Sequence, residues 1–161
     1  MRIATEILKV AADSTEAVEL IRELDEHLMA HPYPAQSRHA FSVEKLLREE
    51  VVFFVTWYES RLAGCGGIKM FGTEYGEVKR MFVRPEFRGK GLGKLMLRHL
   101  ADYARSNDAS ILRLETGIYE VEAIGLYEGF GFQRRAPFGE YVEDPMSVYF
   151  EKRLGSLPNR G

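Results

Sequence analysis

The chain connects an extended segment to an apolar helix through the stretch Val83-Arg84-Pro85-Glu86-Phe87-Arg88-Gly89-Lys90-Gly91-Leu92-Gly93-Lys94. Glycine leaves backbone N–H groups unshielded, and the start of a helix presents several N–H donors without intrahelical partners, together with a partial positive charge. Arg88, Lys90 and Lys94 add full positive charges. This combination predicts a cradle for a compact polyanion such as a pyrophosphate.

Spacing separates the known phosphate-binding patterns. The Walker pattern requires a glycine and a hydroxyl-bearing residue where this chain has Arg88 and Leu95. The dinucleotide pattern G-x-G-x-x-G requires a third glycine where Lys94 stands. The pattern that remains is Arg-x-x-Gly-x-Gly, formed by Arg88, Gly91 and Gly93. A solvated basic turn, in which the glycines only punctuate the helix, is the alternative interpretation.

A second motif follows in the segment Ala123-Ile124-Gly125-Leu126-Tyr127-Glu128-Gly129-Phe130-Gly131-Phe132. Together the two motifs resemble the acyl-CoA signature and the A-x-x-L-Y-x-x-x-G-F segment of the GNAT family of N-acetyltransferases. The resemblance covers residues 77–132. It implies acetyl-CoA as co-substrate and an α+β fold, with a mixed, mostly antiparallel sheet of about seven strands flanked by about four helices. Taken alone, the second segment is also compatible with an ordinary packed helix.

Hydrophobic periodicity predicts the elements around these motifs. The expected strands cover residues 3–10, 51–58, 62–70, 75–83, 111–116, 132–135 and 146–152. The expected helices run from a cap at Asp13 or Ser14 to before His31, from about Ser42 through Leu47, over residues 92–106, and over residues 120–128.

Composition limits the domain organisation and the partners. A chain of 161 residues with 45% hydrophobic residues is long enough for one domain, which we expect over residues 1–154, followed by a disordered tail over residues 155–161. The formal net charge of −2 argues against general binding of nucleic acid or of an anionic membrane. A monomer and a homodimer are both compatible with the sequence.

Cysteine and histidine content also limits the chemistry. Cys65 is the only cysteine, which excludes an intrachain disulfide and favours a reducing compartment. Residues 1–16 lack an apolar signal core, and the longest apolar run, Val51–Val55, is too short to cross a bilayer. We therefore expect a cytoplasmic protein. We expect no metal, because the four histidines show no metal-ligand spacing.

The resemblance assigns donor binding mainly to the backbone. In the family, the strand before the cradle splays away from its neighbour, and its free backbone groups hold the pantetheine arm and polarise the acetyl carbonyl. By position, this role falls on Met81, Phe82 and Val83. Binding of the diphosphate falls on Arg88, Gly89, Lys90, Gly91, Leu92, Gly93 and Lys94.

The resemblance also implies catalytic roles for two side chains. Tyr127 corresponds to the general acid, since a phenol with pKa about 10 can donate a proton to a thiolate whose conjugate acid has pKa near 8.5. Glu115 corresponds to the group that removes the amine proton in some members, and its apolar neighbours can raise its pKa. The alternatives are a packed Tyr127 whose hydroxyl binds a carbonyl, and a Glu115 that is solvated or paired with Arg113.

Glu120 departs from the family pattern, because many relatives have asparagine at this position. Residues 120 and 127 share one helical face, so Glu120 is a candidate contact for the pantetheine arm. A carboxylate accepts hydrogen bonds but cannot replace an amide donor. Capping the helix or approaching the acceptor amine are therefore alternatives for Glu120.

The acceptor implied by the resemblance is a primary amine of a small molecule or peptide. Cys65 is far in sequence from both motifs, so direct attack by the amine is expected, without a covalent acyl-enzyme. The loop around His31 and His39 and the acidic segment 140–144 are near the expected acceptor site, although a surface location is the simpler interpretation of each. A catalytically inactive acyl-CoA-binding or regulatory module is the alternative function, supported by Glu120.

Overall fold

The computed structural model describes residues 4–38 and 41–155. Within these residues the strands are β1 (Thr5–Val10), β2 (Val52–Tyr58), β3 (Arg61–Phe71), β4 (Tyr75–Val83), β5 (Ile111–Gly117), β6 (Gln133–Arg135) and β7 (Ser147–Arg153). The α-helices are α1 (Thr15–Met29), α2 (Val43–Arg48), α3 (Leu92–Ser106) and α4 (Val121–Phe130). In this part of the chain, no helix is both long and apolar enough to cross a membrane. His39 and most of the predicted tail lie outside the described residues.

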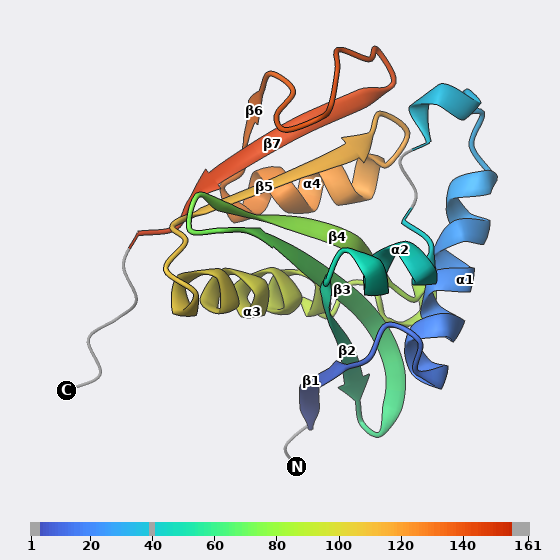
Figure 1. Ribbon diagram of the computed structural model, residues 1–161. Coiled ribbons are helices and arrows are strands. Elements are labelled where there is room, and N and C mark those ends of the chain that lie inside the picture. Colours follow the sequence, from blue (N-terminus) through green and yellow to red (C-terminus); the bar gives the residue numbers. More distant parts are fainter. Residues whose placement is uncertain (1–3, 39–40, 156–161) are drawn as a thin grey trace.

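The seven strands form one sheet in the order β1-β2-β3-β4-β5-β7-β6 (Figure 1). β4 and β5 pair in parallel, and every other neighbouring pair is antiparallel. Buried residues of α1 and α2 pack with one face of the sheet, and those of α3 and α4 pack with the other. The predicted α+β fold with a mixed, mostly antiparallel sheet is confirmed.

Serine side chains cap the two helices on the first face. Ser14 Oγ accepts a hydrogen bond from the backbone N–H of Ala17 at 3.2 Å, and Ser42 Oγ accepts one from Lys45 at 3.1 Å. Each bond satisfies an N–H group that has no partner inside its helix, and such a cap typically stabilises a protein by about 1 kcal/mol. Of the two predicted caps of α1, Asp13 and Ser14, the structure has Ser14.

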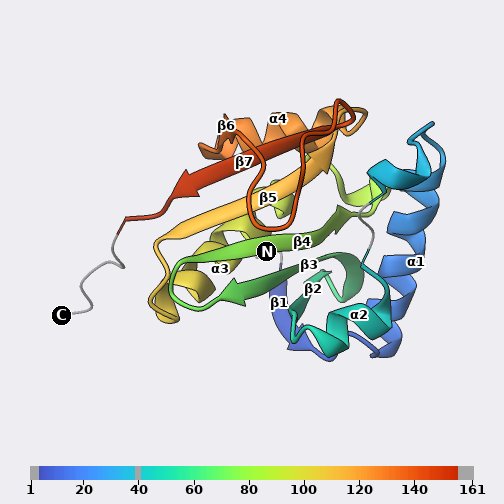
Figure 2. The ribbon, with the colours of Figure 1, turned by 45° about the horizontal axis from the view of Figure 1, so that its top comes forward.

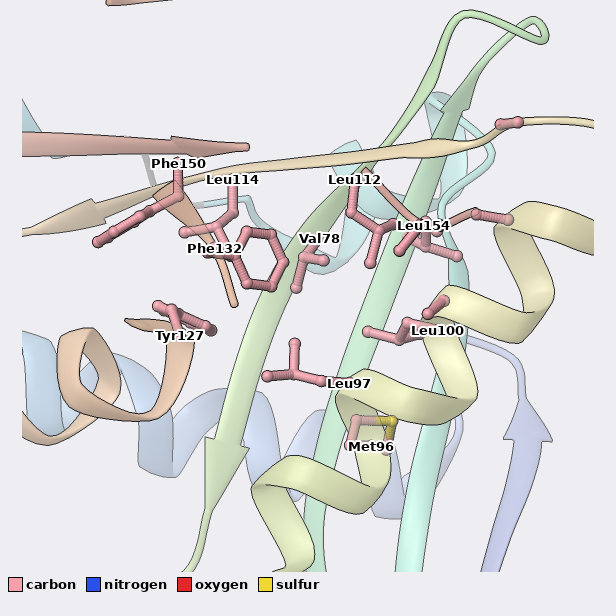
Figure 3. Packing of buried hydrophobic residues seen from close by; sticks show 14 of the residues in the cluster. Val78, Met96, Leu97, Leu100, Leu112, Leu114, Tyr127, Phe132, Phe150 and Leu154 are labelled. Atoms are coloured by element: carbon pink, nitrogen blue, oxygen red, sulfur yellow. The ribbon is translucent and has the colours of Figure 1, made fainter. Parts of the chain in front are cut away.

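The apolar face of α3 anchors the helix that starts at the predicted cradle. Met96, Leu97 and Leu100 point from α3 towards the sheet, where Val78 and Leu112 lie (Figure 3). Leu97 and Leu100 are fully buried, and burial of one such side chain contributes about 1.5–3 kcal/mol. Helix α3 is therefore held firmly against the sheet.

Helices α3 and α4 approach each other closely at Gly93. A Cβ atom at this position would lie 2.7 Å from Leu126 Cδ2. Any larger residue would push the helices apart or displace the leucine. Gly93 thus allows Leu126 of α4 to pack closely against the start of α3.

Strand β4 separates from β5 soon after the two strands pair. The pairing joins only residues 76–77 of β4 to residues 112–113 of β5. Further along β4, opposite residues 65–67 of β3, the register shifts and Arg80 has a φ of 55°. This β-bulge adds a residue to β4 and bends the strand. In Figure 1 the ends of β4 and β5 diverge towards α1.

Candidate active site

A cavity of about 1010 Å³ opens where β4 and β5 diverge. Its walls comprise residues 77–83 of β4, residues 114–117 of β5, the start of α4 and part of the loop between α1 and α2. Every predicted donor-binding or catalytic residue except Lys90 lines this cavity. Met81, Phe82 and Val83 lie on its β4 wall, so the structure brings them together with the cradle.

The cradle has the backbone geometry that an anion site requires. Gly89 and Gly91 have φ angles of 79° and 77°, in the left-handed region that favours glycine. Gly91 is the N-cap residue of α3. Among the described residues, no backbone carbonyl accepts a hydrogen bond from the N–H groups of residues 89–94. These donors fit the oxygens of a diphosphate, as coenzyme A carries.

The charged side chains of the cradle differ in position. Arg88 Nε donates to the carbonyl of Val83 at 3.2 Å, and its Nη1 lies 3.3 Å from Glu122 Oε2. This ion pair is exposed, so its contribution to stability is small. Lys90 Nζ lies 5.4 Å from the ring centroid of Tyr58, and Lys90 is not among the residues that line the cavity.

Glu115 on β5 is a partly buried carboxyl group in the cavity wall. Burial raises the pKa of Glu115 to about 7, although a hydrogen bond from Ser147 Oγ at 2.7 Å and the charge of Lys79 oppose the rise. A carboxyl group with this pKa can act as a general base near neutral pH. The alternative pairing with Arg113 is wrong. Arg113 donates instead to Glu151 at 2.8 Å, because Glu151 lies opposite it in β7.

Tyr127 on α4 has a packed ring and is one of the residues that line the cavity. The side chain is buried and its ring contacts Phe132 and Phe150 (Figure 3). In the described part of the chain the hydroxyl has no hydrogen-bond partner, so the alternative bond to a carbonyl is not made. Burial raises the pKa of Tyr127, and the charges of Glu115 and Glu120 raise it further. The phenol is therefore protonated at neutral pH and can donate a proton.

Glu120 occupies the N-cap position of α4, but its side chain does not cap the helix. Its Oε2 accepts a hydrogen bond from the Tyr33 hydroxyl at 2.5 Å, and its Oε1 lies 3.0 Å from His27 Nε2. The capping alternative is therefore wrong. Glu120 instead connects α4 to the end of α1 and the loop that follows. It also lines the cavity, so its predicted contact with the donor stays a prediction.

Tyr33 was missed by the sequence reasoning. Its hydroxyl accepts a hydrogen bond from the backbone N–H of Tyr119 at 2.9 Å, in addition to donating to Glu120. Its ring lies directly on Gly117, where a Cβ atom would be 2.1 Å from the hydroxyl oxygen. Two flanking prolines indicate an ordered loop, but no sequence signal identifies these partners more than 80 residues away.

Tyr141 is a second missed residue. The loop of residues 136–146 crosses β5 towards β4 (Figure 2), where the Tyr141 hydroxyl donates to Glu77 Oε2 at 2.7 Å and accepts from Lys79 Nζ at 3.1 Å. Glu77 and Lys79 are themselves paired at 2.7 Å and buried. The predicted solvated loop thus exposes Glu140 and Glu143 but places an aromatic side chain in the cavity wall.

Cys65 and His99 are packed side chains outside the cavity. Cys65 is buried, and burial raises the pKa of its thiol to about 12. His99 is partly buried on α3, with its ring 4.6 Å from that of Phe54. Neither residue lines the cavity.

Known proteins are similar to this chain over most of its length. The model of the acetyltransferase (GNAT) family matches residues 7–132, which include both motifs. The chain is 44% identical over 139 residues to an IAA acetyltransferase of Azospirillum brasilense, with 85% of this chain and 90% of that protein covered. It is 36% identical over 151 residues to an uncharacterised N-acetyltransferase of Bacillus subtilis, with 91% and 100% covered.

Solved structures share the fold. A Klebsiella pneumoniae protein provisionally described as an acyl-CoA N-acyltransferase matches with a TM-score of 0.78 at 33% identity, covering 94% of this chain and 98% of that one. The PaiA N-acetyltransferase of Thermoplasma acidophilum, solved in complex with coenzyme A, matches with a TM-score of 0.75 at 22% identity, covering 94% and 99%. With its motifs, fold and relatives in agreement, this chain is an enzyme that belongs to the acetyltransferase (GNAT) family.

Proposed function

We propose that this chain transfers the acetyl group of acetyl-CoA to a primary amine of a small molecule or peptide, by direct attack of the amine on the thioester. One observation carries the proposal. A carboxyl group with a pKa of about 7, on Glu115, and a protonated phenol, on Tyr127, line one cavity that also contains the free N–H groups of the cradle. A base, an acid and an anion site are the groups that acetyl transfer needs.

Donor binding falls to the backbone of the cradle. The N–H groups of residues 89–94, together with the charges of Arg88 and Lys94, would hold the diphosphate of coenzyme A. The β4 wall from Met81 to Val83 would line the path of the pantetheine arm. Acetyl-CoA supplies a thioester with a good leaving group. The chain supplies the orientation of that thioester and the two proton-transfer groups.

The proton transfers follow from the protonation states of the two side chains. Glu115, when ionised, takes a proton from the amine as the new N–C bond forms. Tyr127 gives its proton to the sulfur as the C–S bond breaks, and the phenol regains a proton from solvent. A phenol with a raised pKa is a weaker acid than usual, but its reprotonation is correspondingly favourable.

The acceptor would enter near Tyr141 and the loop of residues 31–38. Glu77 and Lys79 neutralise each other there, and the ionised carboxylates of Glu115 and Glu120, which both line the cavity, can attract an ammonium group. The Azospirillum brasilense relative is named for IAA, so IAA belongs in a panel of candidate acceptors. The other members of the panel are polyamines, amino acids, aminoglycosides and short peptides.

Release of free thiol from acetyl-CoA, measured against this panel, tests the proposal. Tyr127→Phe should lower kcat by about 10²–10⁴-fold, as loss of a general acid does, while the Kd of acetyl-CoA stays near its original value. Tyr103→Phe is the matched control, because Tyr103 lies on α3 away from the cavity. Equal kcat values for Tyr127→Phe and Tyr103→Phe would remove Tyr127 from the acid role. Tight acetyl-CoA binding without acceptor-dependent thiol release would favour the non-catalytic module.

A further inference from the structure

Three side chains with metal-binding atoms meet at the edge of the cavity. His27 lies in the last turn of α1, His31 follows one helical turn later, and Glu120 precedes α4. One ligand atom from each lies within 4.8 Å of the other two. His31 lies just beyond the end of α1, and its ring centroid is 5.6 Å from that of His27. The carboxylate of Glu120, at the start of α4, is the third group.

The surroundings of Glu120 resemble the support that metal ligands receive. The Tyr33 hydroxyl donates to Oε2 at 2.5 Å, which orients the carboxylate and leaves Oε1 directed at His27. A hydrogen bond of this kind to a ligating carboxylate is typical of metal sites. Only 9% of the Glu120 side chain is exposed, against 39% for His27. Among the described residues, no lysine or arginine forms an ion pair with Glu120, so its charge is available to a cation.

We propose that His27, His31 and Glu120 bind a divalent transition-metal ion, with Zn²⁺ as the best match. Two imidazoles and one carboxylate favour zinc and its neighbours over Mg²⁺ or Ca²⁺, which prefer oxygen ligands alone. Three protein ligands leave a fourth position, which would face the cavity that all three residues line. This proposal departs from the expectation of no metal, which considered the spacing of histidines without a distant carboxylate.

The geometry requires only a small adjustment. Tetrahedral bonds of about 2.1 Å place two ligand atoms about 3.4 Å apart. The His27–Glu120 separation of 3.0 Å therefore changes little. The widest pair, within 4.8 Å, closes by up to about 1.4 Å. A half-buried His31, just beyond the end of α1, can make this change by rotation of its side chain.

A simple polar contact is the competing explanation. The His27–Glu120 hydrogen bond could serve only to join α1 to α4, with His31 packed against the Tyr119 ring at 5.7 Å. In that case the three residues would have no specific affinity for a metal. The two explanations differ in the expected effect of replacing His31 on metal affinity, because His31 takes no part in the hydrogen bond.

Titration of the untagged, chelator-treated full chain with Zn²⁺ in a calorimeter tests the proposal, and Co²⁺ absorption reports the ligand geometry. One ion should bind per chain. His31→Ala and Glu120→Gln should each weaken binding by at least about tenfold, and Tyr33→Phe, which removes only a supporting hydrogen bond, by about tenfold. His99→Ala is the control, because it removes a histidine outside the cavity.

Two results would overturn the metal site. The first is the absence of saturable Zn²⁺ binding to the original chain. The second is equal affinity in His31→Ala and His99→Ala. Thermal unfolding in chelator shows whether each variant is folded, and Glu120→Gln supplies a second test of the site if His31→Ala is unstable. Because the readout is metal binding, the result is independent of whether Tyr127 and Glu115 act in acetyl transfer.

Discussion

Replacing Glu115 by glutamine should change the pH dependence of both stability and catalysis. Glutamine has nearly the same shape and can still hydrogen-bond the Ser147 hydroxyl, but it does not titrate. In the original chain, burial raises the pKa of Glu115 from 4.5 to about 7. The folded state therefore holds this proton more tightly than the unfolded state does, and stability depends on pH between those two values.

The sign and size of the stability effect follow from the difference between the pKa of Glu115 in the folded and in the unfolded state. The stabilising contribution of the protonated carboxyl is fully present below pH 4.5 and is lost as the pH rises through about 7. One pKa unit corresponds to about 1.36 kcal/mol, so the rise from 4.5 to about 7 corresponds to roughly 3 kcal/mol. The free energy of unfolding of Glu115→Gln, relative to the original chain, should thus increase by roughly 3 kcal/mol across this window.

Urea denaturation of both chains at several pH values measures this difference. All other titrating groups are common to the two chains, so subtraction isolates Glu115. In acceptor assays the original enzyme should gain activity as the pH rises through about 7. Glu115→Gln should not show this pH dependence, and its kcat should be lower by about 10²–10⁴-fold. A stability difference that stays constant across the window would show that Glu115 titrates as an ordinary surface carboxyl. The reasoning that makes it a neutral-pH base would then be refuted.

Three glycine substitutions test other parts of the structure. Gly91→Val should weaken acetyl-CoA binding in calorimetry, because a β-branched residue at a φ of 77° costs about 1–3 kcal/mol and distorts the cradle; an unchanged Kd would contradict the cradle. Gly117→Ala should raise the acceptor KM, because its Cβ atom would lie 2.1 Å from the Tyr33 hydroxyl and displace the loop; equal acceptor kinetics would contradict this coupling. Gly125→Ala, on the exposed side of α4 with no atom near its Cβ position, should raise the free energy of unfolding by about 1 kcal/mol; a destabilised variant would show that α4 needs its glycine.

Locally encoded features could be predicted from the sequence. The caps at Ser14 and Ser42 depend on residues three positions away, and the stripe on α3 repeats within one helix. The cradle belongs to the same class, because it consists of one continuous stretch whose glycines and helix start act together. For such features, propensity, capping and periodicity favour the same local structure, and no long-range contact competes with it.

Features that depend on strand register could not be predicted. Arg113 and Glu115 alternate onto the same side of β5, so their pairing was a reasonable alternative. The register of β5 with β7 instead places Glu151 opposite Arg113 and brings Ser147 within reach of Glu115. A shift of the β5–β7 register by one residue would give Arg113 and Glu115 other partners. Neither the pairing nor the resulting pKa can therefore be derived before the register is known.

The loop after α1, where we propose that the acceptor enters the cavity, is supported by hydrogen bonds within its own segment. Arg38 supports the loop after α1 by donating to the carbonyls of Tyr33, Leu28 and His31 at 3.1, 3.3 and 3.0 Å. These bonds lie within one short segment and make no contact with the cradle. The loop can thus change in sequence and shape while the glycine turn stays the same. Under our proposal, acceptor specificity depends on this loop, so one donor site could serve different amines.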